Sequence, residues 1–148
     1  MRAVIQRVSQ ASVTIDQQVK GAIEQGLVIL LGVETSDGDT DARWIAEKAA
    51  TLRCFSDDQG RFDQSLEDVQ GAALVVSQFT LFGDCRKGRR PSFVEAAEPE
   101  KAKDLYGKFV KNVGALGVPV EQGRFQALMK VELVNDGPVT LVLESRRD

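Results

Sequence analysis

The sequence predicts an α+β fold in which a mixed, partly barrel-like β-sheet is accompanied by two main helices. About eight segments have the alternating or continuously apolar pattern of strands, whereas only two have the helical period of about 3.6 residues. Two helices are few for covering both faces of such a sheet. Because open sheet edges need partners, we expect the sheet to close into a barrel or to pair with a second subunit.

The first part of the chain contains four strand candidates. They are residues 2–8, 12–15, 19–23 and 26–33. The second and third are expected to form a hairpin around Asp16-Gln17-Gln18. The fourth, GLVILLGV, is a continuous apolar run, which is typical of a strand covered on both sides.

Capping signals and apolar periodicity predict the two helices. The first follows a polar turn and has an N-cap at Asp39 or Thr40. Its apolar face is expected to contain Trp44, Ile45, Ala49 and Leu52. The second begins near Pro99 and ends near Gly114 and Gly117. Its apolar stripe is formed by Ala102, Leu105, Tyr106, Phe109, Val110, Val113 and Leu116.

The other strand candidates lie in the second half of the chain. They are residues 72–79, 118–122, 125–134 and 139–144. A loop region at residues 55–68 precedes them, with a turn at Asp57-Asp58-Gln59-Gly60 and room for a short strand before that turn.

Length and composition indicate one cytoplasmic domain, residues 1–148, with no membrane segment. The chain has 148 residues, a hydrophobic fraction of 43% and a net charge of −3. The charge argues against general coating of a polyanion but leaves room for a local basic patch. The N-terminus alternates like a strand and has no signal-peptide core, and no apolar run reaches the roughly 18 residues of a membrane span. Cys54 and Cys85 lack a CxxC spacing, so we expect reduced thiols.

The sequence contains no histidine. This absence excludes Ser-His-Asp and Cys-His catalysis and removes the commonest zinc ligand. Asp37, Asp39 and Asp41 alternate but lack the glycine and distal glutamate of a calcium loop. We therefore expect no metal and no cofactor.

The segment Asn135-Asp136-Gly137-Pro138-Val139-Thr140 lies between two strand candidates. Asn, Asp and Gly favour turns, and Pro cannot donate a ladder hydrogen bond, so strand pairing is expected to stop here. One interpretation is an ordinary hairpin turn. The other is a cis Gly137-Pro138 bond that presents two carbonyl groups side by side.

Ser77-Gln78-Phe79-Thr80 stands where a buried strand is expected to end. Hydroxyl, carboxamide and free backbone amide groups there could bind a carbonyl group and stabilise its oxyanion. The alternative is that Ser77 and Thr80 only bond local backbone groups.

A basic loop and one aromatic residue suggest nucleic-acid contact. Four cations lie within five residues: Arg86, Lys87, Arg89 and Arg90. They could bind the phosphates of a nucleic acid, or the loop could be solvated and mobile. Arg146-Arg147 could extend this patch. Phe125 could stack on a base, although core packing is the commoner fate of a strand Phe.

Taken together, these segments resemble the D-aminoacyl-tRNA deacylase family from Met1 to about Leu143. The pair of motifs SQFTL and NDGPVT, in this order and spacing, is highly specific. Further matching segments are RAVIQRVS, LR at 52–53 and GRRPSF at 88–93. The resemblance implies a homodimer with active sites at the subunit interface, acting as a proofreading hydrolase on the acceptor end of aminoacyl-tRNA.

The family's site residues carry over by position. Ser77, Gln78, Phe79 and Thr80 match the catalytic strand end that holds the aminoacyl group. Gly137 and Pro138 match the Gly-cisPro pair that enters the partner's site, rejects L-aminoacyl esters and lets D-aminoacyl and glycyl esters pass. The remaining matches are Phe125 and Met129 near the terminal adenosine, Arg7 supporting the Gly-Pro loop, and the basic loop on tRNA phosphates.

Two mechanisms are known for the family: Thr80 as nucleophile, or assistance by the 2′-hydroxyl of the RNA. The absence of histidine favours the second, because a threonine needs a base to activate it. Two segments depart from the family pattern, residues 60–65 and Gln126, and we expect both near the adenosine pocket. Two other functions remain open: nucleic-acid binding without chemistry, and hydrolysis of small D-amino-acid esters.

Overall fold

The computed structural model describes residues 1–145, so Arg146 and Arg147 lie outside the described residues. The elements are, in chain order, β1 (Arg2–Ile15), β2 (Gln18–Ile23), β3 (Gly26–Gly32), α1 (Asp39–Thr51), β4 (Phe55–Ser56), β5 (Phe62–Gln64), β6 (Ala72–Ser77), the 3₁₀ turn η1 (Phe79–Phe82), α2 (Pro99–Ala115), β7 (Val120–Gln122) and β8 (Lys130–Glu144). The predicted α+β class with a mixed sheet and two main helices is confirmed.

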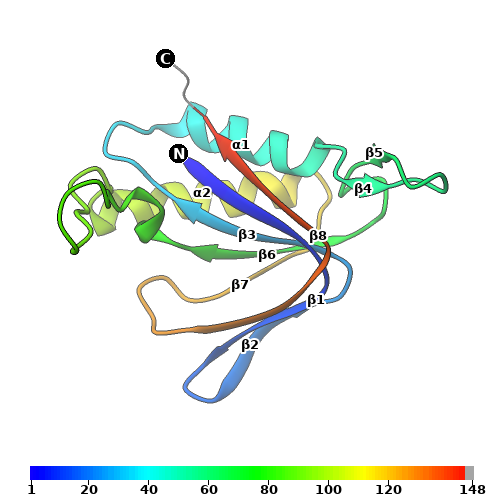
Figure 1. The fold of residues 1–148 in the computed structure, drawn as a ribbon, viewed down its shortest axis with the longest axis horizontal. Coiled ribbons are helices and arrows are strands. Elements are labelled where there is room, and N and C mark those ends of the chain that lie inside the picture. Colours follow the sequence, from blue (N-terminus) through cyan, green and yellow to red (C-terminus); the bar gives the residue numbers. More distant parts are fainter. Residues whose placement is uncertain (146–148) are drawn as a thin grey trace.

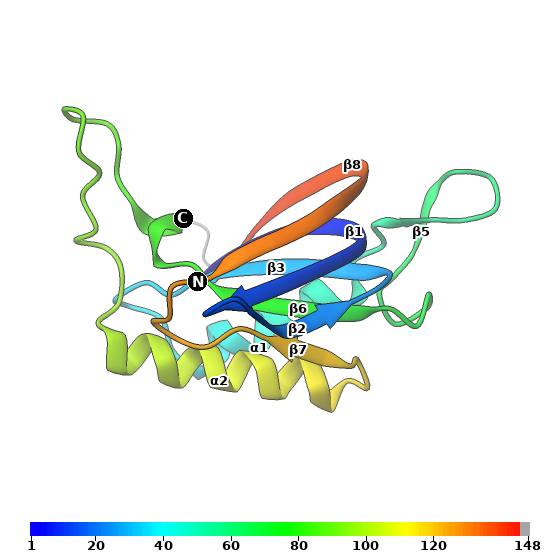
Figure 2. The same ribbon diagram turned by 90° about the horizontal axis from the view of Figure 1, so that it is seen from below.

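The main sheet is built around β1. One edge of β1 pairs antiparallel with β3 and then with β2, and its other edge pairs antiparallel with β8. β3 and β6 are parallel, as are β6 and β7, which gives the order β2-β1-β3-β6-β7 with β8 attached to β1. The sheet curves strongly, and both helices lie on the same side of it (Figures 1 and 2). It therefore approaches a closed barrel while leaving β8 as an edge strand.

Both sides of β3 are buried, as its continuous apolar run predicts. Leu27, Ile29 and Leu31 belong to the larger core, which includes the buried faces of α1 and α2. Val28 belongs to a second cluster, together with Leu74 of β6, inside the curve of the sheet. Alternation of side chains along the strand thus divides one apolar run between two cores.

The start of α1 and one of its side chains differ from the prediction. The helix is capped at Gly38, one residue before Asp39 and two before Thr40, and the Gly38 N–H donates to Oδ2 of Asp41 at 2.9 Å. Ile45 and Ala49 are buried as expected. Trp44 is instead 36% exposed, with the Lys48 ammonium 5.3 Å from its ring centroid. Since alanines fill most of the buried face, the helix packs closely and leaves no room there for an indole.

The strands at both ends of the chain are longer than predicted. β1 is continuous from Arg2 to Ile15, and the expected hairpin to β2 turns at Asp16 and Gln17, which have φ of 50° and 66°. β8 likewise runs from Lys130 to Glu144 along β1, so its central segment is an irregularity within one strand and the hairpin interpretation is wrong. Conversely, residues 125–129 are not in a strand.

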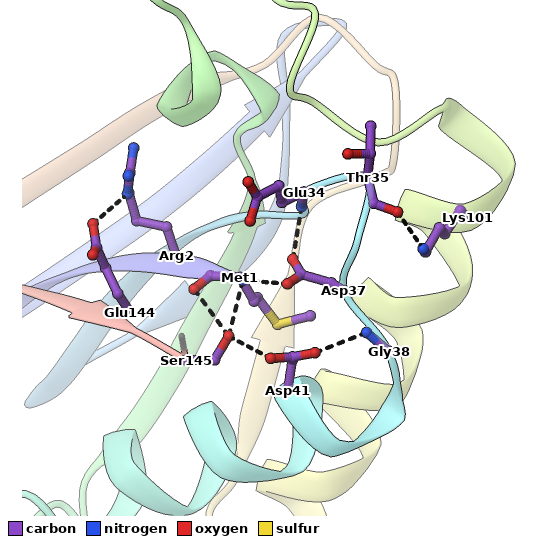
Figure 3. A network of polar contacts seen from close by, with 10 residues as sticks. All are labelled: Met1, Arg2, Glu34, Thr35, Asp37, Gly38, Asp41, Lys101, Glu144 and Ser145. Carbon is purple, nitrogen blue, oxygen red and sulfur yellow. Dashed lines mark hydrogen bonds and ion pairs between the residues drawn. The ribbon is translucent and has the colours of Figure 1, made fainter. Parts of the chain in front are cut away.

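A buried polar network joins the two ends of the described chain (Figure 3). The α-ammonium of Met1 lies 2.6 Å from Oδ1 of Asp37 and donates to Oγ of Ser145 at 2.9 Å. Ser145 in turn donates to Oδ1 of Asp41 at 2.8 Å. Asp37 and Asp41 therefore hold the start of β1 and the end of β8 against the N-terminus of α1.

Candidate active site

A cavity of about 750 Å³ lies at the carboxyl end of β6. Its walls come from the end of β6, the first part of α2 and the loop that precedes β8. The predicted residues that line it are Ser77, Gln78, Phe79, Phe125 and Met129. The fold therefore gathers Ser77, Gln78 and Phe79 and the proposed adenosine residues around one space, although they are far apart in the sequence. Thr80, the last residue of the strand-end motif, is not among the residues that line the cavity.

The strand-end motif leaves β6 and turns directly into η1. Ser77 and Gln78 are half-buried, whereas Phe79 and Thr80 are exposed. The Gln78 N–H is already used, because it donates to the Leu31 carbonyl oxygen at 2.8 Å. The N–H groups of Phe79 and Thr80 start the turn and have no acceptor within residues 1–145. These two amides are the donors that a ligand oxygen could reach.

The hydroxyl group of Thr80 accepts a hydrogen bond from the carboxamide of Gln78. In the part of the chain that the structure describes, neither the Ser77 nor the Thr80 hydroxyl bonds a backbone group. The alternative that these hydroxyls only bond local backbone groups is therefore wrong. A carboxamide NH₂ group donates protons and cannot accept one. The Gln78 carboxamide thus orients the Thr80 hydroxyl without acting as a base.

Aromatic side chains shape the cavity and its rim. Phe125 is half-buried, packs against the core with its ring centroid 6.1 Å from that of Tyr106, and also lines the cavity. Phe79 and Phe93 meet edge to face at 5.1 Å. Tyr106 is buried and its hydroxyl donates to the Val75 carbonyl oxygen at 2.8 Å. Burial raises the pKa of this phenol, which keeps it protonated.

The loop before β8 has one unusual backbone position and one glycine that a neighbouring side chain requires. Gln126 lines the cavity with φ of 62°, in the left-handed region. At Gly123, a Cβ atom would lie 2.3 Å from Sδ of Met129, so the glycine makes room for the Met129 side chain. Gln126 therefore does lie at the cavity, as we expected from its departure from the family pattern.

Residues 60–65 do not line the cavity, which corrects the expectation that this departure lies near it. They belong to the β4–β5 hairpin, which projects from the body of the protein (Figure 1). The Arg7 guanidinium carbon lies 5.6 Å from the centroid of the Phe62 ring. Sequence spacing could not predict the Arg7–Phe62 contact, because it joins β1 to a hairpin far away in the sequence.

Gly137 and Pro138 also lie away from the cavity of their own chain. Both are exposed, and the peptide bond between them is cis. The Arg7 Nε–H donates to the Asp136 carbonyl oxygen at 2.8 Å. Asn135, a turn-favouring residue by its sequence, accepts from the Val139 N–H and donates to Oγ1 of Thr140, both at 2.9 Å. The motif is thus braced from within by Asn135.

The basic loop is exposed, but its four cations differ in their surroundings. Arg86 forms a two-point contact with Asp84, with Nε and Nη2 donating at 2.9 and 2.7 Å. This pairing lowers the pKa of Asp84 to about 2, so both groups are charged at neutral pH. Lys87, Arg89 and Arg90 have no hydrogen bond or ion pair within residues 1–145 and remain open to a ligand.

The side chains that the structure describes contain no group of three or more Cys, Asp or Glu residues placed to hold a metal ion. None of the helices in residues 1–145 is both long enough and apolar enough to cross a membrane. Fold and site define an α+β protein whose reactive centre would rely on hydroxyl and amide groups at a strand end.

Comparison with known proteins identifies the family. The family model described as D-Tyr-tRNA(Tyr) deacylase matches residues 4–144. A D-aminoacyl-tRNA deacylase of a Roseiflexus species is 59% identical over 145 residues, covering 98% of this chain and 94% of its own. That of Fervidobacterium nodosum is 55% identical over 147 residues, with 99% of each chain covered. The chain belongs to the D-aminoacyl-tRNA deacylase family, and it is an enzyme of the hydrolase class.

Solved structures support the fold. That of a c-Myc DNA Unwinding Element Binding Protein has a TM-score of 0.94 and 38% identity and covers 99% of this chain and 100% of its own. Another, of a probable eukaryotic D-amino acid tRNA deacylase, has a TM-score of 0.86 at 18% identity over 97% of this chain and 98% of its own. The second likeness concerns the fold alone.

Proposed function

We propose that this protein hydrolyses the ester bond of D-aminoacyl-tRNA and of glycyl-tRNA, releasing tRNA and the free amino acid, and spares L-aminoacyl-tRNA. The observation that carries the proposal is the cavity that unites Ser77, Gln78 and Phe79 with Phe125 and Met129. Its lining combines polar groups that could bind an ester with aromatic and thioether surface that could bind a nucleobase. Family membership supports the substrate, and we place the activity in the cytoplasm.

Catalysis in this proposal is assisted by the 2′-hydroxyl of the terminal ribose. The Thr80 hydroxyl receives a hydrogen bond from Gln78 and has no base beside it in the described chain. A nucleophilic threonine without a base is a weak nucleophile. The protein would instead position the ester, and the N–H groups of Phe79 and Thr80 would stabilise its oxyanion.

The chirality filter is assigned to Gly137 and Pro138 of a second copy of the chain. These residues are exposed and do not line the cavity of their own subunit. A filter made by them therefore needs the cavity of a partner, which supports a homodimer with two shared sites. The unpaired edge of β8, with Val134 48% and Val142 60% exposed, is consistent with such an association.

Exclusion rather than attraction would give the selectivity. Backbone atoms close to the α-carbon of the bound aminoacyl group would clash with an L side chain, whereas a glycyl ester has no side chain to exclude. A penalty of about 3–4 kcal/mol corresponds to discrimination of several hundredfold. The basic loop would contact phosphates near the acceptor end, chiefly through Lys87, Arg89 and Arg90.

The test is deacylation of matched D-, L- and glycyl-tRNA at catalytic enzyme concentration. We expect rapid turnover of the D and glycyl substrates and little loss of the L substrate. Sedimentation at micromolar concentration is expected to show a dimer. A fully active monomer would contradict the shared site, and equal cleavage of D and L substrates would contradict the filter.

A second candidate is nucleic-acid binding without chemistry. It is favoured by the likeness, at 38% identity, to a protein whose name describes binding to a DNA unwinding element. The basic loop of this chain would then be its main feature. Binding of tRNA without any release of amino acid would favour this alternative. Equal cleavage of a D-amino-acid methyl ester and of the tRNA ester would instead indicate a small-molecule esterase.

A further inference from the structure

Arg7 is the point at which three segments far apart in the sequence meet. Its Nε–H donates to the Asp136 carbonyl oxygen at 2.8 Å, next to Gly137. Its Nη1 group donates to the Cys54 carbonyl oxygen at 3.0 Å and reaches Oγ of Ser56 at 3.4 Å. One guanidinium group of β1 thus links β8 to the start of the β4–β5 hairpin.

The hairpin adds an aromatic contact from its other strand. Phe62 is 55% exposed and lies outside both core clusters. The Arg7 guanidinium carbon lies 5.6 Å from its ring centroid, within the range of a cation–π contact. β4 and β5 pair only with each other in the described chain, and the hairpin stands away from the main sheet (Figure 2). Core packing therefore does not account for the placement of Phe62.

The position of the guanidinium group bears directly on the loop at Gly137. A Cβ atom at Gly137 would lie 2.9 Å from Nη2 of Arg7, so the guanidinium group is packed against the glycine main chain. An arginine side chain is long and has many rotamers, and each added contact reduces its freedom. Hydrogen bonds to Cys54 and Ser56 hold one nitrogen of the guanidinium group, and the Phe62 ring adds a contact with the guanidinium carbon.

We propose that Phe62 and the β4–β5 hairpin position the Gly137–Pro138 loop through Arg7 and thereby set how strictly L-aminoacyl-tRNA is rejected. This inference rests on the proposed function of the loop as a chirality filter. Phe62 is a positioning residue, because it acts through Arg7 and does not line the cavity. Its effect is expected on selectivity and not on the hydrolysis of D substrates.

The experiment measures kcat/KM for matched L- and D-aminoacyl-tRNA with Phe62→Ala, Phe62→Leu and Phe62→Trp. We expect Phe62→Ala to raise the L-to-D ratio about two- to fivefold, the size expected for removing one exposed cation–π interaction. Phe62→Leu is expected to behave similarly, whereas Phe62→Trp keeps an aromatic face and should restore the wild-type ratio. Gln59→Ala, at the exposed tip of the same hairpin, is the matched control and should change nothing.

Arg7→Ala and the double variant separate this inference from the filter itself. If Arg7→Ala admits L substrates and Phe62→Ala does not, the inference is overturned and the filter stands. If Arg7→Ala leaves L rejection intact, the role of the loop as a filter supported by Arg7 fails. In the Arg7→Ala background, Phe62→Ala should have no further effect, and additive effects of the two changes would show that Phe62 does not act through Arg7.

Discussion

The α-ammonium group of Met1 lies 2.6 Å from Oδ1 of Asp37, and both side chains are completely shielded from solvent (Figure 3). The same ammonium donates to Ser145, so a single buried charge joins the start of β1 to the end of β8. A buried charge that loses its counter-ion is strongly destabilising.

We therefore expect Asp37→Asn to lower the free energy of unfolding by about 3–5 kcal/mol, because it leaves the buried ammonium without a negative partner. Urea unfolding at fixed protein concentration measures this change. Asp39→Asn is the control: Asp39 is exposed and pairs with Lys108 at the surface, so its loss should cost less than about 1 kcal/mol. Equal urea midpoints for the two variants would contradict the structural role of the Met1–Asp37 pair.

Asn135→Ala is expected to relax the selectivity for D substrates. The side chain braces the loop by accepting from the Val139 N–H and donating to Thr140, so the substitution removes both hydrogen bonds. Each such hydrogen bond is worth about 0.5–1.5 kcal/mol, which is enough to change the population of the braced loop severalfold. L-aminoacyl-tRNA cleavage should rise before D cleavage falls. A variant with wild-type L rejection would show that Asn135 does not hold the loop.

Thr80→Ala is expected to retain substantial activity, whereas a substrate ending in 2′-deoxyadenosine should be cleaved poorly. Removing a true nucleophile costs several orders of magnitude in rate. Single-turnover deacylation of ribo and deoxy substrates by both proteins makes the comparison. A folded but inactive Thr80→Ala protein, with efficient cleavage of the deoxy substrate by the wild type, would assign the nucleophile to Thr80.

The cations of the basic loop are expected to contribute unequally to tRNA binding. Arg89→Ala or Lys87→Ala should weaken binding and reduce the slope of log K against log salt by about 0.7–0.9 for each phosphate that is no longer neutralised. Arg86→Ala should have a smaller effect, because Arg86 is already paired with Asp84. Binding titrations at several salt concentrations test this order, and an unchanged slope for Lys87→Ala and Arg89→Ala would exclude them as phosphate contacts.

Tyr106→Phe is expected to lower stability by about 1 kcal/mol at neutral pH through loss of one buried hydrogen bond. Because burial raises the pKa of this phenol, the folded protein keeps its proton at a pH where the unfolded chain, with a tyrosine pKa of about 10, loses it. Wild-type stability should therefore decline as the pH rises above about 10, and the variant should decline less steeply. Parallel pH profiles of unfolding free energy for the two proteins would contradict this assignment.

The sequence by itself determined the fold class, most element positions and the candidate catalytic segment. A continuous apolar run identified β3 and a helical apolar period identified α2, because both patterns are local properties of the sequence. The apolar run of β6 placed Ser77 at a strand end in the same way. The glycine and proline at 137 and 138 likewise marked a break in strand pairing, since their backbone restrictions are local properties.

Only the tertiary structure decided how these segments meet. The hairpin interpretation of residues 135–140 failed because both halves of β8 pair with β1 and not with each other. Long-range strand pairing therefore outweighs the turn preference of these residues. Trp44 lies outside the core because four neighbouring alanines allow α1 to pack closely. Phe62 contacts Arg7 and does not line the cavity, because the pairing of β4 with β5 places it beside β1. Such contacts join distant residues through packing and directional hydrogen bonds, and no local pattern in the sequence encodes them.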